Sequence, residues 1–87
     1  VALIGPEDLS VSMGVPGETS HPLVNEAIEK VIEAANRNNV IPAIHMGGVE
    51  PLIGWLAKGM QMVMYSSDLG FIMEASENGL NQIRASL

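Results

Sequence analysis

The residues most capable of chemistry lie just after the first apolar run of the sequence, Val1–Ile4. In the segment Gly5–Ser10, Gly5 lets the backbone approach a ligand closely, and the following residues open a predicted helical turn. The free backbone N–H groups of Glu7 and Asp8 would then favour a carboxylate or a phosphate. The Asp8 side chain adds a hard oxygen ligand, as a divalent cation shared with an anionic substrate requires. The alternative is that Asp8 only caps the turn.

Two histidines and a second aspartate are further candidates. His45 ends an otherwise apolar run, where it is either a hydrogen-bonded wall residue or a substrate contact. His21 precedes a proline at the start of a helical pattern, which favours a capping role over chemistry. Asp68 follows the third apolar run and is predicted to cap the last helix rather than to bind a ligand.

The motifs GxGxxG, GxxxxGK[ST], GxSxG and HExxH are all absent, so the sequence carries no dinucleotide, P-loop, esterase or zinc-protease signature.

These candidates depend on predicted strands and on the helices that follow them. Continuous apolar runs are typical of strands that are covered on both faces. Three such runs alternate with amphipathic helical patterns, which predicts an α/β fold with a parallel sheet. The predicted strands are Val1–Ile4, Val40–Met46 and Met62–Tyr65. A short helical turn is predicted at Pro6–Ser12. The three longer predicted helices run from Pro22 to the asparagines at 36–39, from Val49 to a stop at Gly59, and over Leu69–Ser86.

The strand ends are where a ligand site is expected, because parallel α/β folds bind ligands at the carboxyl ends of their strands. The segments concerned are Gly5–Ser10, His45–Gly48 and Ser66–Gly70. Two residues carry additional expectations. Pro42 lacks an N–H group, which predicts an edge strand or a bulge. Trp55 is expected to lie off the apolar face of its helix and to pack against a neighbour.

Composition narrows the class of protein. The 87 residues allow at most one small domain, and 47% hydrophobic against 16% charged residues is too apolar for a disordered chain. The absence of cysteine excludes disulfides and Cys-ligated metal sites. A net charge of −6, with the four basic residues scattered, argues against a nucleic acid or an anionic membrane as partner. Three parallel strands leave apolar sheet edges, and the sequence opens inside a strand, so we expect a piece of a larger protein or a partner at the edges.

One longer pattern is more specific than the strand–helix alternation. Gly5-Pro6-Glu7-Asp8-Leu9-Ser10, Met13-Gly14, Gly17 and His21-Pro22 together resemble the C-terminal part of the HpcH/HpaI aldolases, and the likeness continues through Gly59 and Ser67-Asp68-Leu69. These are class II pyruvate aldolases of the phosphoenolpyruvate/pyruvate superfamily. The resemblance implies that residues 1–87 are the last three βα units, six to eight, of a (β/α)8 TIM barrel. The chain would then be the C-terminal fragment of a single barrel domain.

The resemblance also implies an activity. Such enzymes are metal-dependent aldolases, carbon–carbon lyases that cleave or form 4-hydroxy-2-oxo acids through a pyruvate enolate, with Mg²⁺, Mn²⁺ or Co²⁺. Asp8 would be a metal ligand, and Gly5, Glu7 and Asp8 would bind the substrate, with backbone N–H groups on the pyruvate carboxylate. His45 stands where members commonly carry an apolar residue on the aldehyde side, so it is a candidate substrate contact for a more polar acceptor. No catalytic residue is expected in this segment, because the catalytic histidine, the arginine that clamps pyruvate and the second metal ligand belong to earlier units.

The implied partners are small molecules, namely pyruvate and an aldehyde, with no nucleic acid and no membrane. The resemblance further implies a cytoplasmic homo-oligomer such as a hexamer, and the isolated fragment is expected to be inactive. Two alternatives stay open. One is a non-catalytic truncated barrel that oligomerises through its open edges. The other is a citrate-type synthase or lyase on the same scaffold, for which His45 is the only local support.

Overall fold

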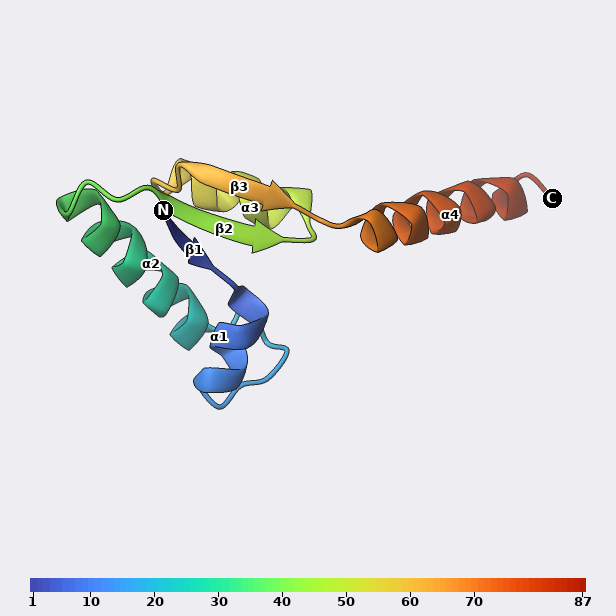
Figure 1. Cartoon of the computed structure of the whole chain (residues 1–87). Coiled ribbons are helices and arrows are strands. Elements are labelled where there is room, and N and C mark those ends of the chain that lie inside the picture. The colour runs from blue at the N-terminus through green and yellow to red at the C-terminus, as the bar shows by residue number, and fades with distance from the viewer.

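The computed structural model describes all residues from Val1 to Leu87. The strands form one parallel sheet in the order β1-β2-β3, so β2 is the central strand (Figure 1). The expected α/β class with a parallel sheet is therefore confirmed. In chain order the elements are β1 (Ala2–Ile4), α1 (Pro6–Ser12), α2 (Pro22–Arg37), β2 (Pro42–Met46), α3 (Val49–Ala57), β3 (Met62–Tyr65) and α4 (Asp68–Ala85).

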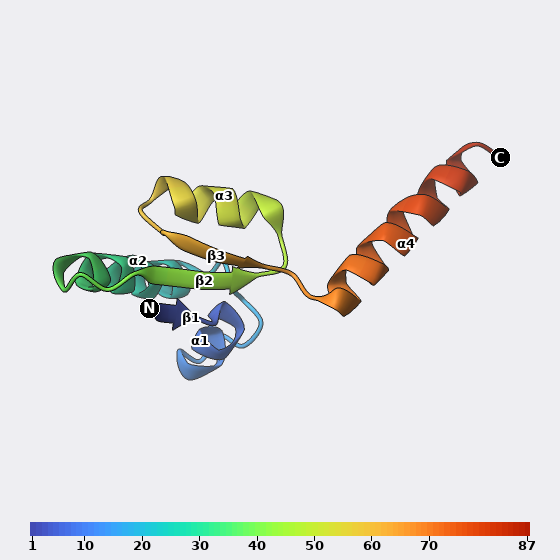
Figure 2. The same cartoon turned by 45° about the horizontal axis from the view of Figure 1, so that its top comes forward.

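One face of the sheet carries the hydrophobic core. The register places Ile4 beside Ile44 and Ile44 beside Val63, so these three side chains share a face. Helices α2 and α3 pack on that face, as the two views in Figures 1 and 2 agree. The buried apolar cluster between sheet and helices consists of Ile4, Val24, Ile28, Ile32, Ile44, Leu52, Trp55 and Met60.

The opposite face of the sheet is open. Alternation along the strands places Leu3, Ala43, His45, Met62 and Met64 on this face. The small Ala43 is buried between Leu3 and Met62, whereas the four larger side chains are exposed. Leu3 is 55% exposed, although its strand reads as a continuous apolar run. Within these 87 residues the strands are thus covered on one face only, and the expectation of strands covered on both faces is not met.

Two expectations about packing are wrong. Pro42 is the first residue of the central strand, a position where a proline is tolerated because no ladder N–H is required of it, and its carbonyl still accepts from the N–H of Gln61 at 3.1 Å. Trp55 lies in the core of this chain and is only 7% exposed. It shares the buried side of α3 with Leu52, three residues earlier, whereas Leu56 is 45% exposed.

The termini of α2 follow from local chemistry. His21 is the N-cap residue, and its Nδ1 accepts a hydrogen bond from the N–H of Leu23 at 3.1 Å, which confirms the predicted capping role. Asn38 is the C-cap residue, and Asn39 has a φ of 55°, in the left-handed region that asparagine tolerates. The asparagines therefore end the helix where expected.

Helix α4 begins at a different cap from the one predicted. The N-cap residue is Ser67, whose Oγ accepts from the N–H of Gly70 at 3.1 Å. Asp68 is the first helical residue, and its carboxylate accepts from the N–H of Leu69 at 2.8 Å. The predicted cap at Asp68 is thus wrong by one residue, because the hydroxyl of Ser67 already accepts the hydrogen bond from the N–H of Gly70 in the first turn.

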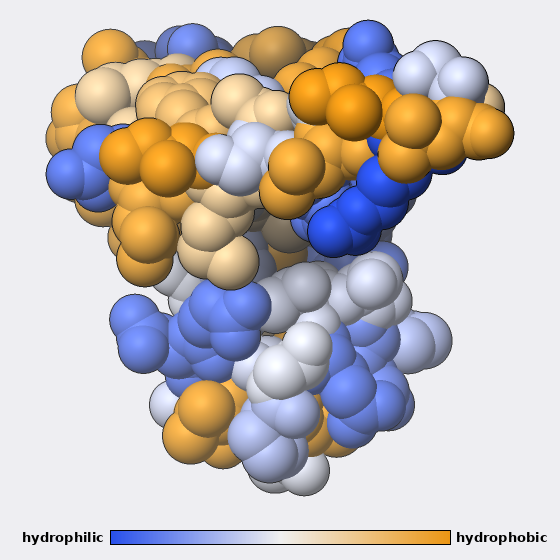
Figure 3. Space-filling view, turned by 90° about the vertical axis from the view of Figure 1, so that its right-hand side faces the viewer, coloured by the Kyte–Doolittle hydropathy of each residue, from blue (hydrophilic) through white to orange (hydrophobic).

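Helix α4 extends away from the sheet and buries no residue (Figures 1 and 2). It gives the molecule its elongated shape of 55 × 27 × 20 Å. In the end-on view of Figure 3, apolar atoms gather over the upper part of the molecule, where α4 points toward the viewer. None of the helices has the length and apolar character that a membrane crossing needs. The large exposed apolar residues of α4 and the C-terminus are Leu69, Phe71, Ile72, Met73, Leu80, Ile83 and Leu87.

Ser10 ties α1 to the loop that precedes α2. Its side chain is fully buried, donates to the carbonyl of Glu7 at 2.6 Å and accepts from the N–H of Gly17 at 3.1 Å. Replacing Ser10 by alanine is expected to lower the free energy of unfolding by about 1–3 kcal/mol, because the N–H of Gly17 loses its partner. Urea-induced unfolding followed by circular dichroism measures this loss. Ser12→Ala, at an exposed position of the same helix, is the control. A loss for Ser10→Ala no larger than that of the control would contradict the assignment.

Candidate substrate site

The carboxyl ends of the three strands meet at one edge of the sheet and border a cavity. Its volume is about 460 Å³, which is in the range of small-molecule sites. Residues that follow each of the three strands contribute to its wall, so the cavity lies at the edge where the sequence predicts chemistry. The lining residues are Pro6, Glu7, Thr19, His45, Met46, Gly47, Gly48, Pro51, Ser66, Ser67 and Gly70.

His45 connects the end of β2 to the loop after β3. Its Nε2 lies 2.7 Å from the carbonyl oxygen of Ser66. A carbonyl oxygen can only accept, so Nε2 carries the proton and donates it. The other ring nitrogen, Nδ1, has no hydrogen-bond partner in the chain. His45 is thus a hydrogen-bonded residue of the cavity wall.

Ser66 is fixed from several directions. Its carbonyl accepts from His45, and its N–H donates to the carbonyl of Met46 at 2.9 Å. Its φ of 56° is uncommon for a residue other than glycine. A Cβ atom at position 70 would collide with the Ser66 hydroxyl, which would have to turn aside if residue 70 carried a side chain. These constraints hold the Ser66 and Ser67 side chains at the wall of the cavity.

Asp8 and Gly5 lie beside β1, next to a second hollow. Asp8 is exposed, and its carboxylate makes no capping hydrogen bond and no ion pair within the chain. A Cβ atom on residue 5 would lie 3.1 Å from Oδ2 of Asp8. Glycine at position 5 therefore avoids a tight contact with the carboxylate. The second hollow measures about 380 Å³, and its wall includes Leu3, Gly5 and Asp8. The capping alternative for Asp8 is not realised in this structure, because Gly5 is the N-cap residue.

The first turn of α1 also presents backbone donors. The first helical hydrogen bond runs from the N–H of Leu9 to the carbonyl of Gly5 at 2.9 Å. The N–H groups of Glu7 and Asp8 precede that bond and have no partner within the helix. Donors and a free carboxylate therefore stand next to each other, as the sequence predicts.

The predicted site residues divide between the two hollows. Glu7 and His45 share the larger cavity, whereas Gly5 and Asp8 border the smaller hollow. The structure does not bring Asp8 and His45 into the same cavity. No three histidine, aspartate or glutamate side chains form a group that could hold a metal ion. Asp8 could thus supply one metal ligand, but these residues do not complete a ligand set.

Three hydroxyl side chains complete the wall of the larger cavity. Ser66 and Ser67 lie in a segment where chemistry is expected, although neither is singled out by the sequence. Thr19 is not anticipated at all. It lies in the loop before α2 and reaches the cavity only because that loop folds back, held by the buried hydroxyl of Ser10. No local sequence signal marks such a residue.

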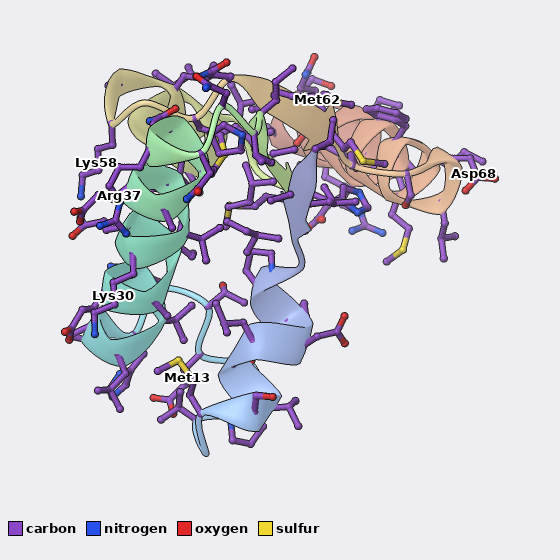
Figure 4. All side chains as sticks on the ribbon, turned by 60° about the vertical axis from the view of Figure 1, so that its left-hand side comes forward. Met13, Lys30, Arg37, Lys58, Met62 and Asp68 are labelled. Carbon is purple, nitrogen blue, oxygen red and sulfur yellow. The ribbon has the colours of Figure 1, made fainter.

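Three of the four basic side chains lie on one flank of the molecule, and Lys58 also borders a smaller hollow that shares Thr19, Met46 and Pro51 with the larger cavity. Lys30, Arg37 and Lys58 line one flank along α2, well away from Asp68 (Figure 4). Lys30 pairs with Glu26 at 3.3 Å, and Lys58 pairs with Glu29 at 2.9 Å. The basic residues are thus less scattered than expected. None of them lines the larger cavity, whereas the carboxylate-bearing residue Glu7 does.

Comparison with known proteins gives one consistent family. The sequence model of the HpcH/HpaI aldolase/citrate lyase family matches residues 1–75. The chain is 32% identical over 74 residues to the 4-hydroxy-2-oxo-heptane-1,7-dioate aldolase of Escherichia coli, covering 85% of the chain and 28% of that protein. It is 23% identical over 82 residues to the hydroxypyruvate/pyruvate aldolase of Paraburkholderia phytofirmans, covering 94% of the chain and 32% of that protein.

Solved structures of the same family share the fold. The crystal structure of an HpcH/HpaI aldolase from Desulfitobacterium hafniense superposes with a TM-score of 0.83 at 34% identity. An aldolase/citrate lyase family protein from Burkholderia cenocepacia superposes with a TM-score of 0.89 at 27% identity. Each superposition covers 94% of this chain and 32% of the other chain. The chain thus spans no more than about a third of the length of these relatives. It belongs to the HpcH/HpaI aldolase/citrate lyase family.

Proposed function

We propose that the chain is part of a metal-dependent aldolase that cleaves or forms 4-hydroxy-2-oxo acids, with pyruvate and an aldehyde as the small-molecule partners. The observation that carries this proposal is the family match over residues 1–75, which includes the segment Gly5–Ser10. Two curated relatives named as aldolases favour this activity over the citrate-type alternative. The unbonded carboxylate of Asp8, at the carboxyl edge of the sheet, supports the same chemistry.

The proposal places residues 1–87 as the last three βα units of a (β/α)8 barrel, the C-terminal part of one barrel domain. The open sheet face supports this placement. Leu3, Met62 and Met64 are exposed on it, and in a closed barrel such residues fill the interior. The outer edges of β1 and β3, which have no strand partner in this chain, would pair with further strands. We refer below to the whole barrel that carries residues 1–87 as the complete enzyme.

Asp8 fits a divalent cation such as Mg²⁺, Mn²⁺ or Co²⁺ as one member of a ligand set. It offers a hard carboxylate oxygen that has no other partner and that borders a hollow. When bound, the cation would stabilise negative charge that develops on the C2 oxygen of pyruvate. The remaining ligands and the catalytic residues would come from earlier barrel units.

The other residues of the first turn bind and orient the substrate in this proposal. The free N–H groups of Glu7 and Asp8 donate to the pyruvate carboxylate, where the partial positive charge of a helix start favours an anion. Gly5 allows the close approach, because it has no side chain between the strand end and Asp8. His45, in the neighbouring cavity, contacts the aldehyde.

Assembly and location complete the proposal. The exposed apolar side chains of α4 support a homo-oligomer, because a surface of this kind is stabilised by a covering partner. We propose that the oligomer works in the cytoplasm. Analytical ultracentrifugation of the complete enzyme tests the assembly, and a stable monomer would contradict it.

Exchange of the pyruvate methyl protons tests the activity most simply. The complete enzyme is incubated with pyruvate in deuterated water, and the methyl signal is followed by NMR. The proposal predicts loss of the signal when a divalent metal ion is supplied, with no aldehyde required, and retention of the signal with excess chelator. No exchange under either condition, together with no aldehyde-dependent consumption of pyruvate, would leave a non-catalytic scaffold as the better description.

A further inference from the structure

Ser10 is the only buried residue of the chain with a polar side chain. A serine inside a helix often bonds the carbonyl of the preceding turn, as its hydroxyl does here with Glu7 at 2.6 Å. The same hydroxyl also accepts from the N–H of Gly17 at 3.1 Å, and the Ser10 carbonyl accepts from the N–H of Val15 at 2.9 Å. The loop before α2 is therefore fastened twice to this one residue. Because hydrogen bonds are stronger in a buried place than in water, the hydroxyl holds both of its partners firmly.

The Glu7 carbonyl that Ser10 holds belongs to the peptide group that leads into Asp8. A peptide group is planar, so a bond that fixes its carbonyl oxygen also restrains its N–H and the Cα atom that follows. On the other side of Asp8, the N–H of Leu9 donates to the carbonyl of Gly5 at 2.9 Å. The backbone is thus held both before and after Asp8.

The Asp8 carboxylate depends on this backbone for its direction. Side chains that ligate metals are usually oriented by further hydrogen bonds to the side chain itself. Asp8 has no such bond and no ion pair within the chain. Its position therefore follows from the peptide group that precedes it and from the room that Gly5 leaves beside it.

We infer that Ser10 is a positioning residue for Asp8. Its buried hydroxyl ties the Glu7 carbonyl to the loop at Gly17, and this keeps the Asp8 carboxylate in place for a divalent cation. The inference rests on the proposed function, which makes Asp8 a metal ligand. Ser10 borders neither the larger cavity nor the hollow beside Asp8, so it acts only through its neighbours.

Titration of the complete enzyme with Mn²⁺, with the free ion followed by electron paramagnetic resonance, tests the inference. Ser10→Ala is expected to weaken Mn²⁺ binding about tenfold, as is found for residues that orient a metal ligand. Ser10→Cys fills nearly the same space, but its thiol is a weak donor, so it is also expected to bind more weakly than the wild type. The Mn²⁺ concentration for half-maximal turnover should rise with the Kd, whereas kcat at saturating Mn²⁺ should stay within a few-fold of the wild type.

Ile32→Val is the control for a loss of stability. Ile32 is buried beside Gly59, which precedes β3, so this variant weakens the core without changing the first turn of α1. Unfolded molecules lower the number of Mn²⁺ sites but leave the Kd of the folded molecules unchanged. Ile32→Val should therefore keep the wild-type Kd, and a loss of affinity as large as that of Ser10→Ala would contradict the inference.

The remaining outcomes separate positioning from a merely structural role of Ser10. A wild-type Kd for both Ser10 variants, with only the number of sites reduced, would overturn the inference while Asp8 kept its proposed role. A wild-type Kd for Ser10→Cys alone would also overturn it, because lost packing would then explain Ser10→Ala. If Ser10→Ala does not fold, weaker binding by Ser10→Cys supports the inference and a wild-type Kd contradicts it. A wild type that binds no Mn²⁺ and exchanges no pyruvate protons would refute the proposed function, and the inference with it.

Discussion

Replacing Asp8 by alanine in the complete enzyme is expected to reduce turnover of pyruvate and aldehyde by at least about 100-fold. The expectation follows from the proposed role of Asp8 as a metal ligand, since even residues that only orient a ligand contribute about 10–100-fold to metal affinity or activity. The side chain is exposed and makes no hydrogen bond or ion pair within the chain, so its removal should leave the fold intact. Steady-state kinetics at a fixed, non-saturating metal concentration, with circular dichroism as a check on folding, measures the effect.

Asp68→Asn is the matched control for this experiment. Asp68 also follows a strand, but its carboxylate accepts from the N–H of Leu69, and it borders neither hollow. The control should change turnover by no more than a few-fold. Equal losses for both variants would mean that the Asp8 effect is a general consequence of removing negative charge. An unchanged rate for Asp8→Ala would remove Asp8 from the site.

The largest effect on stability is expected for Ile44→Ala. Ile44 is fully buried in the central strand, between Ile4 on one side and Val63 on the other, under the helices of the core. Truncation to alanine leaves a cavity that the surrounding strands cannot fill by collapsing. The expected loss in the free energy of unfolding is about 2–5 kcal/mol. Urea-induced unfolding followed by circular dichroism gives the value.

Ile53→Ala provides the comparison, because the residue type is the same and the position on α3 is 55% exposed. Its expected change is within about 0.5 kcal/mol. If the two variants lost similar amounts, the core would not lie between the sheet and the helices as described. A small loss for Ile44→Ala alone would point to a loosely packed interior.

The elements of the fold could be predicted well because their signals are local. The run Met62–Tyr65 is closed by polar residues and forms a strand with the predicted bounds. The capping of α2 by His21 also follows from adjacent residues. Trp55 could not be placed in this way. Leu52 lies three residues from Trp55 and four from Leu56, so either residue can share a helix face with Leu52. The rotation of α3 about its own axis, which depends on packing against the sheet, decides that Trp55 is buried and Leu56 is exposed.

The site could be predicted only in part. The position of Asp8 after a strand, beside free amides, is a local feature that the structure retains. The bond between His45 and Ser66 joins residues 21 positions apart, and it depends on the register of β2 against β3. The entry of Thr19 into the cavity depends on how a long loop folds back on α1. Periodicity and residue type contain no information about such long-range placement.

Binding of Mn²⁺ tests the central claim most directly. Free Mn²⁺ is followed by electron paramagnetic resonance while the complete enzyme is titrated, with and without pyruvate, for the wild type, Asp8→Ala and Asp68→Asn. The account predicts that the wild type and Asp68→Asn bind the ion and bind it more tightly with pyruvate, and that Asp8→Ala loses at least about 100-fold in affinity. Equal affinity of the wild type and Asp8→Ala, with no effect of pyruvate on either, would contradict it.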